Sequence, residues 1–319
     1  MTQSTQRGRQ KAAAAPKRAA AAPKQKAAAA PRQRAAAAPK RAAAAPRQKT
    51  AAAPKQKAAA APKQAAPALT GEQLGEFLTL IKGADSVELK LSIPDAARRS
   101  AVAALDMDPL EAQMRQVVFF DTPALTLNQH GLVVRARLIQ GRPGDSVVKL
   151  RPVVPDQLPA TLRRSPSFGV EVDALPGGFV CSGSMKAELD PARFKDVLSG
   201  LLPVRKLFTK HQRSFFSAYA PNDLELDGLE MLGPVTVLKL KFRPVEYDRR
   251  LVAELWNYPD GSRILELSTK CAPADTFTVA AEARAFLAGR GIDLLGEQQT
   301  KTRTALEFFA RELAADTTG

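Results

Sequence analysis

Charged and apolar residues alternate with a period of two along most of the second part of this chain. Within residues 86–93, Val87 and Leu89 fall on one face of an extended strand, and Glu88 and Lys90 fall on the other. Such segments can form only sheets with one apolar face and one charged face. Four later segments carry same-face pairs of like charge: Arg135 with Arg137, Lys149 with Arg151, Glu171 with Asp173, and Lys239 with Lys241.

Turn residues separate these runs, so the sequence predicts many short strands. We expect them at residues 86–93, 116–121, 132–139, 146–151, 168–174, 207–219, 235–242, 249–257 and 263–270. Amphipathic runs predict helices at residues 71–82, 94–105, 190–198, 275–289 and 299–313. This order predicts an α+β fold, an antiparallel β-barrel with peripheral helices.

The charged face has two interpretations. A sheet with one face in water would show the same alternation. A surface face usually mixes its charges with Thr, Ser and Gln, however, whereas here Arg and Lys recur in pairs and carboxylate pairs occupy other strands. If the sheet closes with this face inward, it forms a tunnel lined by cations, with carboxylates at defined places. Such a tunnel would suit a phosphate chain and a divalent metal ion.

The first 68 residues differ in composition from the rest of the chain, and they account for the positive net charge of +15. They contain 16 of the 47 Lys and Arg residues and none of the 32 Asp and Glu residues. Runs of alanine alternate with single prolines, which interrupt any helix, and no large side chain is available for a core. We therefore expect two parts: a disordered basic tail, 1–68, and a folded domain, 69–319.

A flexible basic tail binds polyanions by releasing their counterions. Its composition resembles the Ala/Pro/Lys tails of linker-histone-like bacterial proteins. DNA and inorganic polyphosphate would both satisfy it, and a solubilising linker with no partner or an organellar transit peptide are the alternatives. We expect a cytoplasmic protein, associated with the nucleoid or with polyphosphate, and no membrane partner, because the apolar runs are too short to span a bilayer.

Few residues are available for other kinds of site. The chain has two cysteines, Cys181 and Cys271, and two histidines, His130 and His211. That number argues against a disulfide framework and against a structural zinc site. A metal ion would therefore be held by carboxylates.

One block of motifs is specific enough to suggest a family. Phe120-Asp121-Thr122-Pro123 is followed by Gly131-Leu132 and then by Arg135-Ala136-Arg137. Over residues 84–310 the chain resembles the CYTH family of triphosphate tunnel metalloenzymes, which includes class IV adenylyl cyclases, thiamine triphosphatases and inorganic tripolyphosphatases. In that family an aromatic-Asp-Thr-Pro turn precedes an Arg-x-Arg strand.

The resemblance extends to the family's charged strands, with two departures. The first Glu-x-Glu-x-Lys motif corresponds to residues 86–90 and the late one to residues 266–270, and serine replaces one glutamate in each, at Ser86 and Ser268. A serine hydroxyl is a weak ligand for a hard dication. Residues 235–242 match no motif of the family, and Glu254 is a position from which a compensating carboxylate could come.

The resemblance implies cations that clamp phosphate oxygens, carboxylates that hold Mg²⁺ or Mn²⁺, and water as the nucleophile. The implied phosphate-binding residues are Lys90, Arg135, Arg137, Lys149, Arg151, Lys210, Arg213 and Lys270. The implied metal ligands are Glu88, Glu171, Asp173 and Glu266.

Three functions remain open at this point. The first is metal-dependent hydrolysis of triphosphate or polyphosphate. The second is polyanion binding without turnover, which the loss of one carboxylate in each metal motif favours. The third is a nucleoid protein that binds DNA through its tail. Adenylyl cyclase activity is the least expected, because no adenine-recognising feature can be identified in the sequence.

Overall fold

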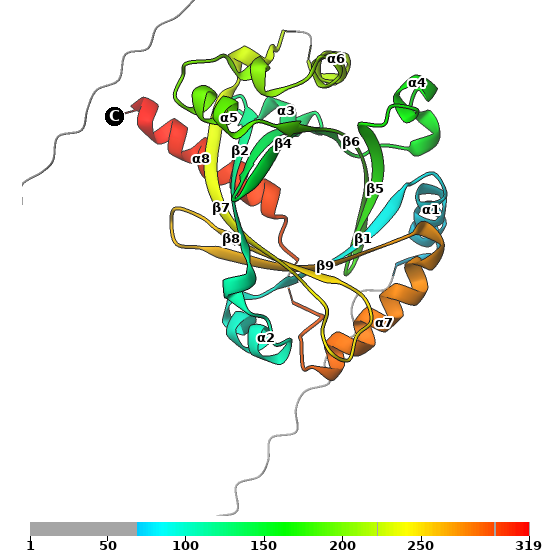
Figure 1. Cartoon of the computed structure of the whole chain (residues 1–319). Helices are drawn as coiled ribbons and strands as arrows, with labels where there is room; N and C mark the ends of the chain where they lie inside the picture. Colours follow the sequence, from blue (N-terminus) through cyan, green and yellow to red (C-terminus); the bar gives the residue numbers. More distant parts are fainter. Residues whose placement is uncertain (1–68, 222, 297, 319) are drawn as a thin grey trace, which may run out of the picture. The chain divides into compact units, whose positions relative to one another are not determined.

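The described residues form nine strands that close into a barrel (Figure 1). The structure is a computed structural model and describes residues 69–221, 223–296 and 298–318. Around the barrel the order is β1-β5-β6-β4-β3-β2-β7-β8-β9, and β9 pairs with β1. The predicted fold class is thereby confirmed. The strands are β1 Ser86–Ile93, β2 Gln113–Asp121, β3 Leu132–Ile139, β4 Arg142–Leu150, β5 Phe168–Leu175, β6 Gly178–Leu189, β7 Glu230–Phe242, β8 Leu251–Asn257 and β9 Arg263–Cys271.

One pair of neighbouring strands, β1 and β5, is parallel, and the other pairs among the described strands are antiparallel. This detail of topology decides which charged residues meet. In register, Glu88 of β1 lies beside Asp173 of β5 on one side and beside Lys270 of β9 on the other. The closing seam of the barrel is therefore where the carboxylates gather.

Helices surround the barrel (Figure 1). They are α1 Gly71–Lys82, α2 Arg98–Ala104, α3 Thr126–Gln129, α4 Ala160–Arg163, α5 Pro191–Leu198, α6 Lys210–Tyr219, α7 Thr276–Gly289 and α8 Lys301–Thr318. Phe77 of α1, Phe194 of α5 and Phe216 of α6 belong to one buried cluster with the outer faces of several strands. Leu287 of α7 belongs to a second cluster, with Leu91 and other outward residues of β1 and β9. Apolar burial thus occupies the outside of the barrel wall, which leaves the charged face inward.

A third apolar cluster lies on the inner face and fills one end of the barrel. Trp256 belongs to this cluster and lies on the same face of β8 as Glu254, two residues earlier. Along β8 the inner face therefore changes from charged to apolar. The Phe119 and Trp256 rings stack with centroids 6.4 Å apart. Leu306 of α8 packs into the same cluster. Helix α8 therefore covers this end of the barrel and brings its first residue, Lys301, to the charged interior.

The strand predicted at residues 207–219 is wrong, because those residues lead into helix α6. Thr209 caps this helix: its hydroxyl accepts from the Gln212 amide, and the Gln212 side chain accepts from the Thr209 amide. This reciprocal cap is the strongest local helix-start signal, and it outweighs the weak alternation that follows. Phe215 and Phe216 are then buried on one side of the helix.

Strand β6 was missed by the sequence analysis although it runs over Gly178–Leu189. Its inward positions include Ser182 and Ser184, which are buried and small, so the strand lacks the charged alternation of its neighbours. The tail predicted at residues 1–68 lies outside the described residues. Within the described ranges, no helix combines the length and apolar character that a membrane span requires.

Candidate functional site

The charged face lines a cavity of about 730 Å³ inside the barrel. Thirteen Lys or Arg residues line it against five Asp or Glu residues. Like charges confined in one cavity repel one another, so an excess of cations is unfavourable unless anions enter. The lining cations are Lys90, Arg135, Arg137, Lys149, Arg151, Lys186, Lys239, Lys241, Arg243, Arg249, Arg250, Lys270 and Lys301.

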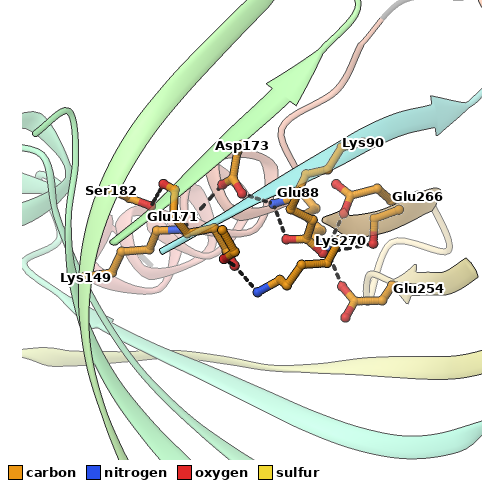
Figure 2. Close-up of polar contacts among 12 residues, drawn as sticks. Glu88, Lys90, Lys149, Glu171, Asp173, Ser182, Glu254, Glu266 and Lys270 are labelled. Carbon is orange, nitrogen blue, oxygen red and sulfur yellow. Dashed lines mark hydrogen bonds and ion pairs between the residues drawn. The ribbon is translucent and has the colours of Figure 1, made fainter. Parts of the chain in front are cut away.

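Carboxylates gather on one side of the cavity, at the seam of β9, β1 and β5. Glu88, Glu171 and Asp173 each offer one oxygen, and these oxygens lie within 4.8 Å of one another. Lysines already pair with them (Figure 2). Lys90 Nζ lies 3.2 Å from Glu88 Oε2 and 2.8 Å from Asp173 Oδ1, and Lys149 Nζ lies 3.4 Å from Asp173 Oδ2.

These contacts shift the ionisation of both partners. Burial alone would raise the pKa of Asp173, but Lys149 and Lys90 hold it well below its usual range. Burial alone would lower the pKa of Lys90, but Asp173 and Glu88 raise it above its ordinary value. At neutral pH Asp173 and Lys90 are therefore both ionised.

The two serines that replace motif glutamates face this cluster. The Ser268 hydroxyl donates to Glu88 Oε1 at 2.9 Å, and the Ser86 hydroxyl donates to Glu171 Oε2 at 3.4 Å. Lys270 also pairs with Glu171. The serines thus orient the remaining carboxylates, and they occupy the places from which further carboxylates would reach the same point.

A second carboxylate group lies deeper, toward the apolar end. Lys301 Nζ pairs with Glu254 and lies 2.7 Å from Glu266 Oε1, and Lys239 Nζ lies 2.7 Å from Glu254 Oε1. Trp256 Nε1 donates to Glu254 Oε2 at 3.3 Å. Burial would raise the pKa of Glu254, but Lys301 and Lys239 hold it well below its usual range. Lys301, the first residue of α8, thus lies between the carboxylates of Glu254 and Glu266.

Cations outnumber carboxylates on the opposite wall, which β3, β4 and β6 form. Arg137 binds Asp145 through two hydrogen bonds of 2.8 and 2.6 Å. Arg135 has no such partner, and its Nε atom is buried without a hydrogen bond among the described residues. Burial lowers the pKa of Arg135 to about 10 and the pKa of Lys149 to about 8. Burial also lowers the pKa of Lys186.

The structure brings most of the residues implied by the resemblance to this cavity and leaves three elsewhere. Those that line it are Glu88, Lys90, Arg135, Arg137, Lys149, Arg151, Glu171, Asp173 and Lys270. Lys210 and Arg213 do not line it, because they lie on helix α6 at the outside of the barrel, where Arg213 Nη1 donates to the Phe208 carbonyl. Glu266 lies apart from the three-carboxylate cluster because Lys301 binds it.

Nine further charged residues that line the cavity were not assigned to the site from the sequence, among them Lys186, Lys239, Lys241, Glu254 and Lys301. Lys239 and Lys241 showed the same-face pairing but matched no motif, and Glu254 had only its strand position as a signal. Lys301 belongs to a basic segment that the resemblance covers without giving it a role. Lys186 lies on the strand that was not predicted, so no signal pointed to it.

The donor set of the carboxylate cluster fits a hard divalent cation. Three carboxylate oxygens from two adjacent strands converge, and such oxygens are the ligands that Mg²⁺ and Mn²⁺ prefer. The cavity as a whole can therefore hold an anion against its Arg135 wall and a cation against the β1–β5 seam.

Comparisons with known proteins identify the fold. No family model and no curated protein matches this chain. The solved structure of HpAC1 from Hippeastrum, described as a proposed adenylyl cyclase with a dominant triphosphatase activity, aligns with a TM-score of 0.52 and 19% identity, over 68% of this chain and 93% of that one. A proposed adenylate cyclase from Bacillus halodurans aligns with a TM-score of 0.48 and 11% identity, over 69% of this chain and 97% of that one. The likeness to HpAC1 shows that the two chains share a fold.

Proposed function

We propose that this chain binds linear triphosphate or inorganic polyphosphate in the barrel cavity and hydrolyses it with a divalent metal ion. The observation that carries the proposal is Arg135, whose buried Nε has no hydrogen-bond partner among the described residues, on a wall where cations outnumber carboxylates. A buried cation of this kind is stabilised when an oxyanion accepts a hydrogen bond from it. The shared fold with HpAC1, a protein described as having triphosphatase activity, supports the same conclusion.

Glu88, Glu171 and Asp173 would hold the metal ion. Bound there, Mg²⁺ or Mn²⁺ would neutralise charge on the phosphoryl group and lower the pKa of a coordinated water. The family resemblance points to the same three residues.

The lysines of the cluster have a second role in this proposal. Lys90 and Lys149 line the cavity and pair with the carboxylates of β1 and β5. When a cation neutralises the carboxylates, these ammonium groups are free to bind phosphate oxygens instead. Arg135, Arg137 and Arg151 then hold the phosphate chain from the opposite wall, which positions it for attack by water.

A second candidate function is binding without turnover. Ser86 and Ser268 supply hydroxyls where the family motifs have carboxylates, so the metal site has fewer charged ligands. A cavity with a weak metal site would still retain its excess of cations, and it would act as a polyanion receptor.

One experiment separates these functions. The full chain is incubated with tripolyphosphate and Mg²⁺ or Mn²⁺, and both released phosphate and heat of binding are measured. Metal-dependent release that Arg135→Gln and Glu88→Gln both abolish is the expected result. Binding without release supports the receptor. If neither release nor binding occurs, the proposal fails.

The tail is a separate proposal. We propose that residues 1–68 form a tail that engages DNA or polyphosphate, attached to a CYTH-like domain of residues 69–319, and that tethering raises the local concentration of polyphosphate at the cavity. Replacing the Lys and Arg residues of the tail by Gln should abolish DNA binding in a mobility-shift assay and leave tripolyphosphate binding unchanged. DNA binding that persists would place it in the folded domain.

A further inference from the structure

The two strands β7 and β8 carry a gradient of side chains along the inner face. At the deep end Val237 pairs with Trp256, next Lys239 pairs with Glu254, and then Lys241 pairs with Val252. Arg243 follows Lys241 by two residues and Arg250 precedes Val252 by two, so the alternation continues into the loop that joins the strands. Both arginines line the cavity. From Lys239 to Arg243 the strand rise is roughly 13 Å, so cations extend well beyond the ion-paired centre.

The outer cations of this series are uncompensated. Lys239 is paired with Glu254, but no carboxylate of the described residues lies within ion-pair distance of Lys241, Arg243 or Arg250. All three side chains belong to exposed residues at the mouth of the cavity. Asp248 is the acidic residue that also lines this mouth, and its backbone carbonyl accepts a 3.0 Å hydrogen bond from Arg243 Nη1.

The loop that carries these cations is fixed to helix α7. Tyr247 is buried and stacks on Phe286 of α7, with ring centroids 4.8 Å apart and an interplanar angle of 12°. Arg249 Nε lies 2.6 Å from Glu282 Oε2, and Glu246 pairs with Arg290 at 3.0 Å. The loop backbone is thus positioned before any ligand arrives, which lowers the entropic cost of binding.

The chemistry of the mouth distinguishes between phosphate ligands. A nucleoside triphosphate held by its phosphates would place its sugar and base at the mouth, where base recognition in proteins usually involves stacking on an aromatic ring. Trp256 is the one aromatic among the described lining residues, and it lies at the deep end against Phe119. Tyr247 is turned away into its stack on Phe286. The described residues at the mouth thus offer an excess of cations over the one carboxylate, Asp248, and no aromatic ring, which suits further phosphates better than a base.

We infer that Lys241 and Arg243 form a subsite for additional phosphates, so that the ligand of the cavity is a linear inorganic polyphosphate longer than tripolyphosphate and not a nucleotide. This inference rests on the proposed function and specifies its substrate class. The inner cations hold the end of the chain, and the mouth cations hold the phosphates that follow.

The test uses a probe that the chain itself supplies. Trp256 is its only tryptophan and lines the cavity, so intrinsic fluorescence reports occupation of the cavity and is blind to binding elsewhere. The full chain is titrated in EDTA, which prevents metal-dependent turnover, with tripolyphosphate, a longer linear polyphosphate of defined length, ATP, and an oligonucleotide carrying a 5′-triphosphate. The variants are Lys241→Gln/Arg243→Gln and the control Arg193→Gln/Lys195→Gln, which removes two exposed charges from α5.

The longer polyphosphate should bind the unmodified chain more tightly than tripolyphosphate does, by roughly fivefold for two exposed ion pairs. The mouth variant should lose most of that difference, and the control should keep it. An unchanged preference in the mouth variant, or ATP or the oligonucleotide binding as tightly as the longer polyphosphate, would overturn this inference alone. If tripolyphosphate leaves the fluorescence of the unmodified chain unchanged, the proposed function and this inference both fail.

Discussion

The barrel contains two groups of carboxylates that differ in how they are neutralised. Glu88, Glu171 and Asp173 lie at the β1–β5 seam, and Glu254 and Glu266 lie deeper, beside the apolar end. The seam group is paired with lysines from several strands that also face open cavity, and one of them, Lys270, has a side chain that is 52% exposed. The deep group is bound by Lys301, whose side chain is 15% exposed.

The difference indicates that lysines have two different roles in this barrel. Lys270 at the seam can exchange one anion for another, because solvent and ligand reach its half-exposed side chain, whereas Lys90 and Lys149 are only 13% and 17% exposed. Lys301 cannot, because it enters from α8 and is enclosed between Glu254 and Glu266. We therefore assign ligand binding to the seam and attachment of α8 to the deep group, and each of the following changes tests this division.

The largest effect should come from removing the deep cation. Lys301→Met leaves two buried carboxylates with only Lys239 beside them, and the free energy of unfolding should fall by about 3 kcal/mol. Urea unfolding measures the loss. The matched control is Lys270→Met at the half-exposed seam, which should cost at most about 1 kcal/mol. Equal losses in the two variants would contradict the division.

Removal of Arg135, by contrast, should weaken ligand binding without lowering the free energy of unfolding. Arg135→Gln should weaken tripolyphosphate binding by about 1–3 kcal/mol, because a charge-assisted hydrogen bond is lost. The free energy of unfolding should stay the same or rise, since a buried unpaired Nε is removed. Calorimetry and urea unfolding of one preparation give both values. Unchanged binding would show that the wall formed by β3, β4 and β6 does not contact the ligand.

Adding carboxylates at the two serine positions of the seam should raise its affinity for divalent metal ions. Ser86→Glu with Ser268→Glu adds two carboxylates beside Glu171 and Glu88. We expect divalent metal to bind roughly tenfold more tightly, which is about 1.4 kcal/mol, with faster phosphate release. Titration calorimetry with Mn²⁺ checks the affinity, and Ser86→Gln/Ser268→Gln controls for size. If turnover and metal affinity both stay constant, the assignment of these two positions is wrong.

The smallest expected effect is a dependence on pH. Burial lowers the pKa of Lys149 to about 8, so the folded protein without ligand loses this charge as the pH rises through that value. A bound anion favours the charged form, so binding takes up a proton, and affinity should fall above pH 8 by at most about tenfold per pH unit. Lys149→Arg keeps its charge and should show a flatter profile, apart from protons on the ligand itself. Identical profiles would exclude Lys149 from the linkage.

The sequence was sufficient for the barrel because burial and charge alternate with the period of a strand. In β3, for instance, Val134 and Ala136 face outward into the core and Arg135 and Arg137 face the cavity, as the pattern predicts. Such alternation survives any order of strands around the barrel. It therefore could not reveal that β1 pairs in parallel with β5, a pairing of distant segments that depends on closure.

The errors have specific causes. Lys210 and Arg213 were placed on a strand by analogy with a motif, whereas the capping box at Thr209 and Gln212 begins a helix there. Lys186 was missed because its strand is rich in glycine and serine, which give no alternation. Lys301 reaches the interior from α8, and no periodic pattern predicts which helix enters a barrel.

The pairing of the first strand with the last also has a consequence for biosynthesis. Glu88 on the first strand meets Ser268 on the last, 180 residues later in the chain. Contacts so distant in sequence form late and carry a large loop-closure entropy. A nascent chain on the ribosome therefore holds an open sheet with exposed edges until β9 has emerged. The polypeptide acquires its barrel and its anion-binding interior in the same closing step.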